Sequence, residues 1–182
     1  MHGMIFNELK NYADLKYGNS AWGDLIKESG LNTRFYLPIK DYPDEEIVNI
    51  IVTASKLLGK TVDFLLEDFG EFVSHKFIGN YKQLIKPEWN VLDFIQNVEE
   101  EVHVIMRKLV RGSRPPVLKY KRVNNKELIV YYSSERKLCV LAKGVIRGAG
   151  NHYKEKLVIL EKNCMHKGAD CCEIVVINTN SL

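Results

Sequence analysis

One histidine and a polar triplet are the residues of this sequence best suited to chemistry. The histidine, His103, lies in a long segment of helical periodicity. A proline pair at 115–116 ends that segment, and Tyr132, Ser134 and Arg136 then alternate along an extended stretch. Residues i, i+2 and i+4 of a strand point to one face, so a phenol, a hydroxyl and a guanidinium lie side by side, each able to donate to a carboxylate. Opposite a histidine in an apolar chamber, such donors suit a ring-shaped cofactor with a metal centre and acidic edge groups.

Each part of this pattern also has a plainer interpretation. A single histidine on a helix is most often hydrogen-bonded or partly exposed. A polar strand face ending in Arg136 is most often a solvated surface. Haem ligation therefore depends on the combination of these residues and not on any one of them.

A second candidate site lies in the last quarter of the chain, which holds all four cysteines. Cys164, Cys171 and Cys172 stand with His166 within nine residues, and Cys139 precedes them. Thiolates and an imidazole at this spacing suit a tetrahedral Zn²⁺ ion. The adjacent pair Cys171 and Cys172 equally fits a thiol redox sensor, and ordinary unliganded cysteines are the third interpretation.

Length and composition exclude several classes of protein. The 182 residues, 46% hydrophobic and 27% charged, predict a single globular unit. The net charge of +3 comes from interspersed charges, which disfavours a nucleic-acid partner. Because no signal peptide or spanning apolar segment is recognisable, we expect a soluble, cytoplasmic protein without a membrane partner. No nucleophile–base pair or paired carboxylates stand out, so we expect no enzyme.

Helical elements must position the histidine, and extended ones must position the triplet. Apolar residues recur at helical spacing between residues 5 and 77 and again from residue 91 to about 112. In the second segment the expected buried stripe is Ile95, Val98, Val102, Ile105 and Leu109. His103 lies about 100° from that stripe, in line with Met106 and Val110.

The periodicity changes to two after the prolines. Residues 117–123 and 127–133 flank a predicted hairpin turn, and residues 154–161 and 171–178 add two more strands. A helix from Leu138 to Ile146 stands between these pairs, and Gly148 and Gly150 predict its end. The sequence therefore predicts an α+β fold, in which a helical N-terminal half packs on a C-terminal antiparallel sheet with one inserted helix.

These motifs together resemble the H-NOX family of haem nitric-oxide/oxygen-binding domains. The resemblance is carried by His103, the prolines at 115–116, the Y-x-S-x-R triplet, the opening M-x-G and Phe69-Gly70, and it covers essentially the whole chain. It implies one domain, 1–182, with a distal helical subdomain at about 1–65, a proximal subdomain at 66–182 and haem b buried between them.

The resemblance also implies a role for each residue. His103 would be the proximal iron ligand, and Tyr132, Ser134 and Arg136 would hold the haem propionates. Pro116 would press on the porphyrin. The other expected pocket residues are Ile5, Phe77, Leu9, Val73 and Leu141.

The expected gas follows from three apolar positions. Oxygen-binding members of the family carry a distal tyrosine where this sequence has Leu141, supported by residues at the positions of Leu9 and Val73. A distal side of the haem pocket that lacks a hydroxyl group favours the binding of nitric oxide over that of O₂. By resemblance, NO would break the iron–His103 bond and signal to a histidine kinase or a diguanylate cyclase. The alternatives are an O₂-binding or O₂-sensing haem protein, and then a haem carrier or haem enzyme.

The cysteine segment resembles one found in some bacterial H-NOX proteins that bind zinc. The resemblance implies Cys139, Cys164 and Cys172 as ligands. Glu161 stands where those proteins have a histidine, so Glu161, His166 or Cys171 are the candidates for the fourth ligand.

Overall fold

The secondary structure changes from helix to sheet at the proline pair. The computed structural model describes residues 1–32, 35–109 and 112–180. Its α-helices are α1 Gly3–Tyr17, α2 Ala21–Glu28, α3 Asp44–Leu58, α4 Val62–Asn80, α5 Val91–Val98, α6 Val104–Leu109 and α7 Cys139–Tyr153. Its strands are β1 Val117–Asn124, β2 Glu127–Ser133, β3 Leu157–Asn163 and β4 Cys172–Asn178. The predicted α+β class is confirmed.

The four strands form one antiparallel sheet in the order β1-β2-β4-β3. Alternation along β2 places Leu128, Val130 and Tyr132 in the hydrophobic core. Tyr132 pairs with Leu118 of β1 on one side and with Cys172 of β4 on the other. The register therefore places the polar triplet and the cysteine segment in neighbouring strands.

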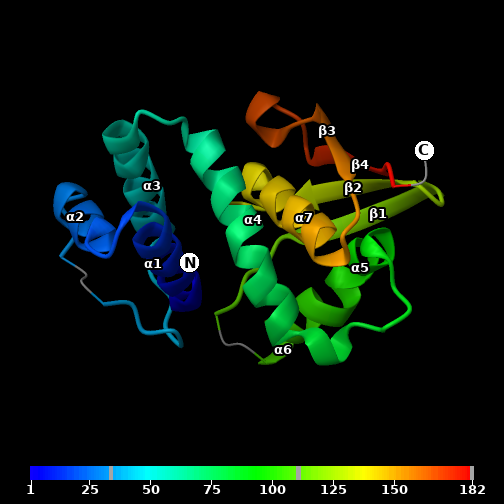
Figure 1. Cartoon of the computed structure of the whole chain (residues 1–182), viewed down its shortest axis with the longest axis horizontal. Coiled ribbons are helices and arrows are strands. Elements are labelled where there is room, and N and C mark those ends of the chain that lie inside the picture. The colour runs from blue at the N-terminus through cyan, green and yellow to red at the C-terminus, as the bar shows by residue number, and fades with distance from the viewer. Residues whose placement is uncertain (33–34, 110–111, 181–182) are drawn as a thin grey trace.

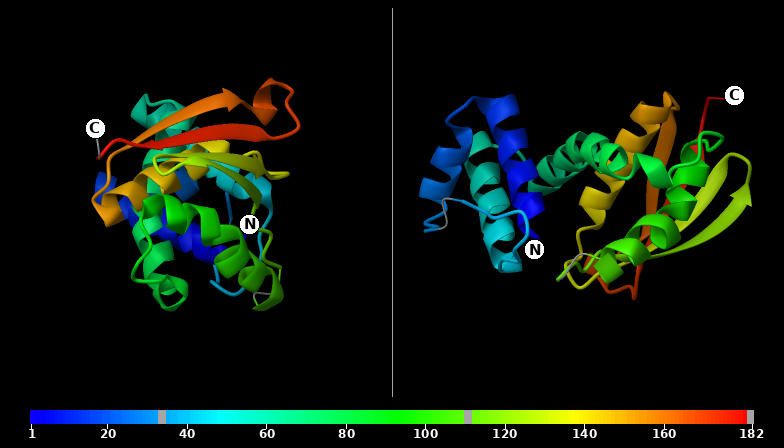
Figure 2. Two further views of the ribbon diagram at one scale, coloured as in Figure 1. Left: turned by 90° about the vertical axis from the view of Figure 1, so that its right-hand side faces the viewer. Right: turned by 90° about the horizontal axis from the view of Figure 1, so that it is seen from below.

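The elements form two groups joined by α4. Figure 1 shows α1, α2 and α3 at one end of the molecule and the sheet at the other, with α4 and α7 side by side between them. The second group consists of α5, α6, α7 and the sheet. Figure 2 shows its helices packed over one face of that sheet. Among the described residues, no helix combines the length and apolar content needed to cross a bilayer.

Close packing of α4 on α7 depends on glycine. A Cβ atom on Gly70 would lie 2.3 Å from the carbonyl oxygen of Leu141, and one on Gly144 would lie 2.0 Å from that of Glu67. No real side chain tolerates such distances, and both obstacles are backbone atoms. The two helices therefore approach until their backbones nearly touch, which fixes the part of α7 that carries Leu141.

Two predicted helix details are wrong. Helix α7 continues through Gly148 and Gly150 to Tyr153. Gly148 does not end the helix but allows α7 to pack closely on α4, since a Cβ there would lie 2.0 Å from the Ser74 hydroxyl oxygen. The expected single helix from residue 91 is interrupted by a π-helical turn, Glu99–His103, in which the Val104 N–H donates to the Glu99 carbonyl five residues back. Such widened turns commonly mark functional sites.

Candidate functional site

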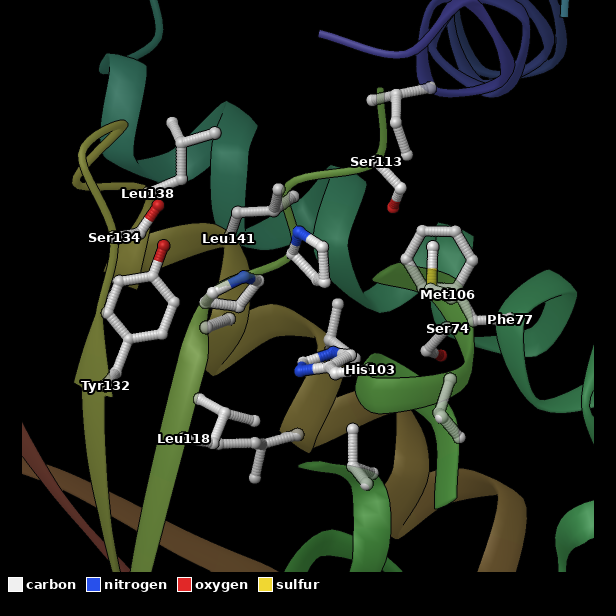
Figure 3. A pocket seen from close by; sticks show the side chains of 18 of the residues that line it. Ser74, Phe77, His103, Met106, Ser113, Leu118, Tyr132, Ser134, Leu138 and Leu141 are labelled. Carbon is white, nitrogen blue, oxygen red and sulfur yellow. The ribbon is translucent and has the colours of Figure 1, made fainter. Parts of the chain in front are cut away.

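A large cavity lies where α4, the α5–α6 segment, α7 and the sheet meet. The empty space between these elements is about 1660 Å³, a volume that includes space open to solvent. Its walls are mainly apolar side chains from these four elements, including Phe94, Ile95, Val98, Val145 and Ile146. Figure 3 shows His103 inside this cavity, with Tyr132 and Ser134 at one side of it. The sequence-predicted histidine and two of the triplet residues therefore share one chamber.

The π-helical turn brings His103 to the cavity wall together with Val102 and Met106. The His103 ring is mostly buried, and its Nδ1 lies 3.1 Å from Oε2 of Glu99. Burial lowers the pKa of His103, and it outweighs the Glu99 hydrogen bond, which acts to raise it. The imidazole is therefore neutral near pH 7, the form that binds a metal ion. Of the other predicted neighbours, Val110 lies outside the described residues.

Tyr132, Ser134 and Arg136 all line the cavity. The predicted extended segment is wrong beyond Ser133, where β2 ends, and a turn closed by the Lys137 N–H and the Ser134 carbonyl places Arg136 there instead. Burial raises the pKa of Tyr132 to about 12, so its phenol keeps its proton and remains a hydrogen-bond donor. The Ser134 hydroxyl accepts the backbone N–H of Arg136 at 3.3 Å. A phenol, a hydroxyl and a guanidinium thus stand together at one edge of an apolar chamber.

Arg136 also connects the two groups of elements. Its Nε donates to Oδ2 of Asp44, at the start of α3, at 2.9 Å, and its Nη1 donates to the Arg114 carbonyl at 2.7 Å. Burial acts to raise the pKa of Asp44, but hydrogen bonds from the amino terminus of Met1 and from Arg136 outweigh it and lower the pKa. Asp44 is therefore ionised at neutral pH and joins α3 to the triplet.

The remaining predicted pocket residues divide into two sets. Ile5, Phe77, Pro116 and Leu141 line the cavity. Leu9 and Val73 are buried in the hydrophobic core but are not among the residues that line it.

Ser74 lines the cavity beside Phe77 and was missed by sequence reasoning. It is fully buried, and its hydroxyl donates to the Glu71 carbonyl at 2.7 Å. Helical phase was the available signal, because Ser74 lies three residues before Phe77 and therefore on the same face of α4. The cavity wall thus contains a hydroxyl group, but one that is already engaged with its own helix.

The residues present fit haem. A macrocycle needs a large apolar chamber, a neutral imidazole for its iron and donors for its carboxylates. The cavity, His103 and the Tyr132–Arg136 edge supply these three features in one place.

The three cysteines predicted as metal ligands form a separate buried cluster. The sulfur of Cys164 lies 3.7 Å from that of Cys139 and 3.8 Å from that of Cys172. Three sulfurs at 2.3 Å from a tetrahedral zinc ion would stand about 3.8 Å apart, so the spacing matches. Burial raises the pKa of Cys139 and of Cys172, so both are thiols at neutral pH in the absence of a metal ion.

None of the three candidates for the fourth ligand lies in this cluster, which consists of Cys139, Cys164 and Cys172 among the residues described. Glu161 forms an ion pair with Lys143 at 3.2 Å. Nε2 of His166 donates to the Lys137 carbonyl at 2.7 Å. Cys171 is half-buried and belongs to no cluster that the described part of the chain contains.

Comparison with known proteins decides the family. The family model described as Haem-NO-binding matches residues 2–161. The chain belongs to the Haem-NO-binding family. This family consists of haem-based gas sensors, also called H-NOX domains, and its members bind haem and are sensors, not catalysts.

Solved H-NOX structures resemble this chain over its whole length. An H-NOX protein from Shewanella oneidensis in the Fe(II)NO ligation state is 26% identical with a TM-score of 0.91, covering 99% of this chain and 100% of that one. The unliganded Fe(II) H-NOX protein from K. algicida has the same fold at 20% identity and a TM-score of 0.89, covering 100% and 98%.

Two curated relatives are Soluble guanylate cyclases 89Da and 89Db of Drosophila melanogaster. Each is 24% identical over an alignment of 140 positions that covers 75% of this H-NOX chain. The match spans only about a fifth of the length of these cyclases.

Proposed function

We propose that this H-NOX domain is a nitric-oxide sensor, in which His103 is the axial ligand of haem b and is released when NO binds. One observation carries the proposal: a buried, neutral imidazole lines an otherwise mainly apolar cavity whose edge holds Tyr132, Ser134 and Arg136. Bound haem would supply a ferrous iron with one coordination position open to a diatomic gas.

The chain's own residues would hold and enclose this group. Tyr132, Ser134 and Arg136 would bind the propionates as hydrogen-bond donors and, for Arg136, as a positive charge. Pro116 would press on the ring from the side of His103. Ile5, Phe77 and Leu141 would exclude water from the chamber, with Leu9 and Val73 packed behind the wall.

The polarity of the cavity wall supports NO over O₂. A hydrogen-bond donor stabilises bound O₂, whereas NO needs none. Leu141 offers no donor, and the Ser74 hydroxyl is committed to the Glu71 carbonyl. The Shewanella oneidensis relative in the Fe(II)NO state also supports this choice.

O₂ binding or sensing is the second candidate, and Ser74 is the observation that favours it. Its hydroxyl is part of the cavity wall and could donate to a ligand after a rotation about one bond. Such a rotation would cost the hydrogen bond to Glu71, which ranks this function below NO sensing.

The signal would be a change of contacts between the two groups of elements. We assign residues 1–65 to a distal and 66–182 to a proximal subdomain, joined through the Asp44–Arg136 ion pair. Release of His103 would let the π-helical turn and Pro116 relax, and a partner would bind one of the two resulting states. The expected partner is a histidine kinase or a diguanylate cyclase in the cytoplasm.

We also propose that Cys139, Cys164 and Cys172 bind a zinc ion, with the fourth position taken by a small rearrangement of His166, Cys171 or Glu161. The sulfur spacing supports this, and zinc binding would release the protons that burial keeps on the thiols while no metal ion is bound.

Metal analysis of protein purified without chelator tests the zinc site. We expect one zinc per chain and its loss in Cys164→Ala. Cys171→Ala is the control with the same change outside the cluster of three thiols. A folded wild-type protein free of zinc would refute the site.

Substitution of His103 tests the haem assignment. We expect His103→Gly to lose haem during purification, and free imidazole to restore haem binding by entering the space that the side chain leaves. His152→Gly, which removes an exposed histidine from α7, should retain haem. Normal haem uptake by His103→Gly without imidazole would show that another residue binds the iron.

A further inference from the structure

The carboxylate of Glu99 is the centre of a hydrogen-bonded cluster behind His103. Its Oε2 lies 3.1 Å from Nδ1 of His103 and accepts the Leu118 N–H at 3.0 Å. Its Oε1 accepts Nη2 of Arg107 at 2.7 Å. The Glu99 side chain is only 16% exposed, so these contacts are little screened by water.

This contact selects one tautomer of the histidine. An ionised carboxylate only accepts hydrogen bonds, so the proton of the neutral ring lies on Nδ1 and points to Glu99. The lone pair is then on Nε2, the other nitrogen of a ring that lines the cavity. A carboxylate acting on the far nitrogen also makes a metal-binding imidazole a stronger electron donor.

Arg107 opposes this effect. The Nη2 that binds Glu99 also donates to the Pro116 carbonyl at 3.0 Å, so one guanidinium joins the carboxylate to the residue at the cavity edge. Its positive charge draws electron density from Glu99 and weakens the pull of the carboxylate on the His103 proton. The Arg107 side chain is 32% exposed and does not line the cavity, so it can be replaced without opening the core.

We infer that Glu99 and Arg107 form an opposed pair of positioning residues that sets the strength of the iron–His103 bond, and thereby how readily NO breaks it. Glu99 strengthens the bond by holding the Nδ1 proton, and Arg107 limits that strengthening. The inference rests on the proposed role of His103 as the iron ligand.

Resonance Raman spectroscopy of the reduced, gas-free haem protein measures this bond directly through its iron–histidine stretching frequency. We expect Glu99→Gln to lower the frequency, because an amide accepts the Nδ1 proton more weakly. Arg107→Ala should raise it, because Glu99 regains its full charge. Glu100→Gln is the matched control, since it removes the same charge from the adjacent, exposed residue.

The haem midpoint potential provides a second readout. A more strongly donating histidine favours ferric iron, so Glu99→Gln should raise the potential and Arg107→Ala should lower it. The Raman shift separates a hydrogen-bond effect from simple charge, because Glu100→Gln changes the local charge without changing the His103 contact. Should Glu99→Gln fail to fold, the Arg107→Ala shift alone carries the test.

Opposite Raman shifts in the two variants, with no shift in Glu100→Gln, support the inference. Equal frequencies in wild type, Glu99→Gln and Arg107→Ala would overturn it while leaving His103 as the ligand. If the wild-type protein lacks an iron–histidine vibration altogether, the proposed function fails with it.

Discussion

At the scale of single residues, the proposed preference for NO rests on Leu141 and Ser74. Leu141 provides no hydrogen-bond donor, and Ser74 has a hydroxyl that is held by the Glu71 carbonyl. The proposal of NO over O₂ therefore rests on one missing hydroxyl and one occupied hydroxyl. His103 would bind the iron with either gas.

Adding the missing donor should change the gas preference. Leu141→Tyr places a phenol in the cavity wall, and one hydrogen bond to a ligand is worth about 1.4 kcal/mol, so we expect O₂ affinity to rise about tenfold. Gas-binding absorption spectra measure this. Leu141→Phe adds the same ring without the hydroxyl and should leave O₂ affinity unchanged. Equal O₂ affinity in the two variants would show that position 141 does not reach the gas.

The sequence predicts the residues of the haem site to different extents. Tyr132 is predictable from strand alternation, but β2 ends at Ser133 and a turn, not a strand, brings Arg136 to the cavity. Ser74 is not predicted because the family resemblance indicates its neighbour Val73 as the pocket residue. Only the helical spacing between Ser74 and Phe77 indicates that Ser74 faces the cavity. The Glu99 contact was also missed, since an acidic residue four positions before a histidine reads as an ordinary helical ion pair.

At the scale of elements, the contact between α4 and α7 holds one wall of the cavity. Gly70 and Gly144 allow the two backbones to approach, and Leu141, Ala142 and Val145 of α7 then line the cavity. The glycine at 148, predicted as a helix end, has the same packing role. Glycine in a helix reads as a terminator from sequence alone, and only the partner helix shows that it marks close contact.

A methyl group at Gly144 should separate the two helices. We expect Gly144→Ala to destabilise the protein by about 1–3 kcal/mol, because the obstacle is the Glu67 backbone and neither helix can yield locally. Gly79→Ala is the matched control: it lies in α4 with nothing within 4 Å of its Cβ position and should be neutral or stabilising. Urea unfolding measures both, and equal stability of the two variants would contradict the close packing.

The π-helical turn at Glu99–His103 was not predictable. It inserts one extra residue into a helical turn, and a regular apolar stripe carries no signal of that insertion. The turn places Val102, His103 and Met106 together at the cavity. A regular α-helix would instead place His103 beside the predicted apolar stripe that contains Val102. The predicted stripe member Ile105 does not line the cavity.

At the scale of the whole molecule, the cavity lies beside the two helices that stand between the ends of the fold. Helices α1–α3 form one end, the sheet forms the other, and α4 and α7 join them (Figure 1). Class, order of elements and antiparallel sheet were predictable from the change of periodicity at the prolines, because that pattern reflects which faces are buried. The strand order β1-β2-β4-β3 follows from long-range pairing, which no local pattern specifies.

The absorption spectrum of the reduced, haem-loaded protein on addition of NO tests the central claim most directly. We expect the spectrum to become that of a five-coordinate NO complex as His103 is released, and to match the NO complex of His103→Gly whose haem has been restored with free imidazole. The same protein should form no stable complex in air. A six-coordinate NO complex that keeps His103, or a stable O₂ complex, would contradict a nitric-oxide sensor that acts through this histidine.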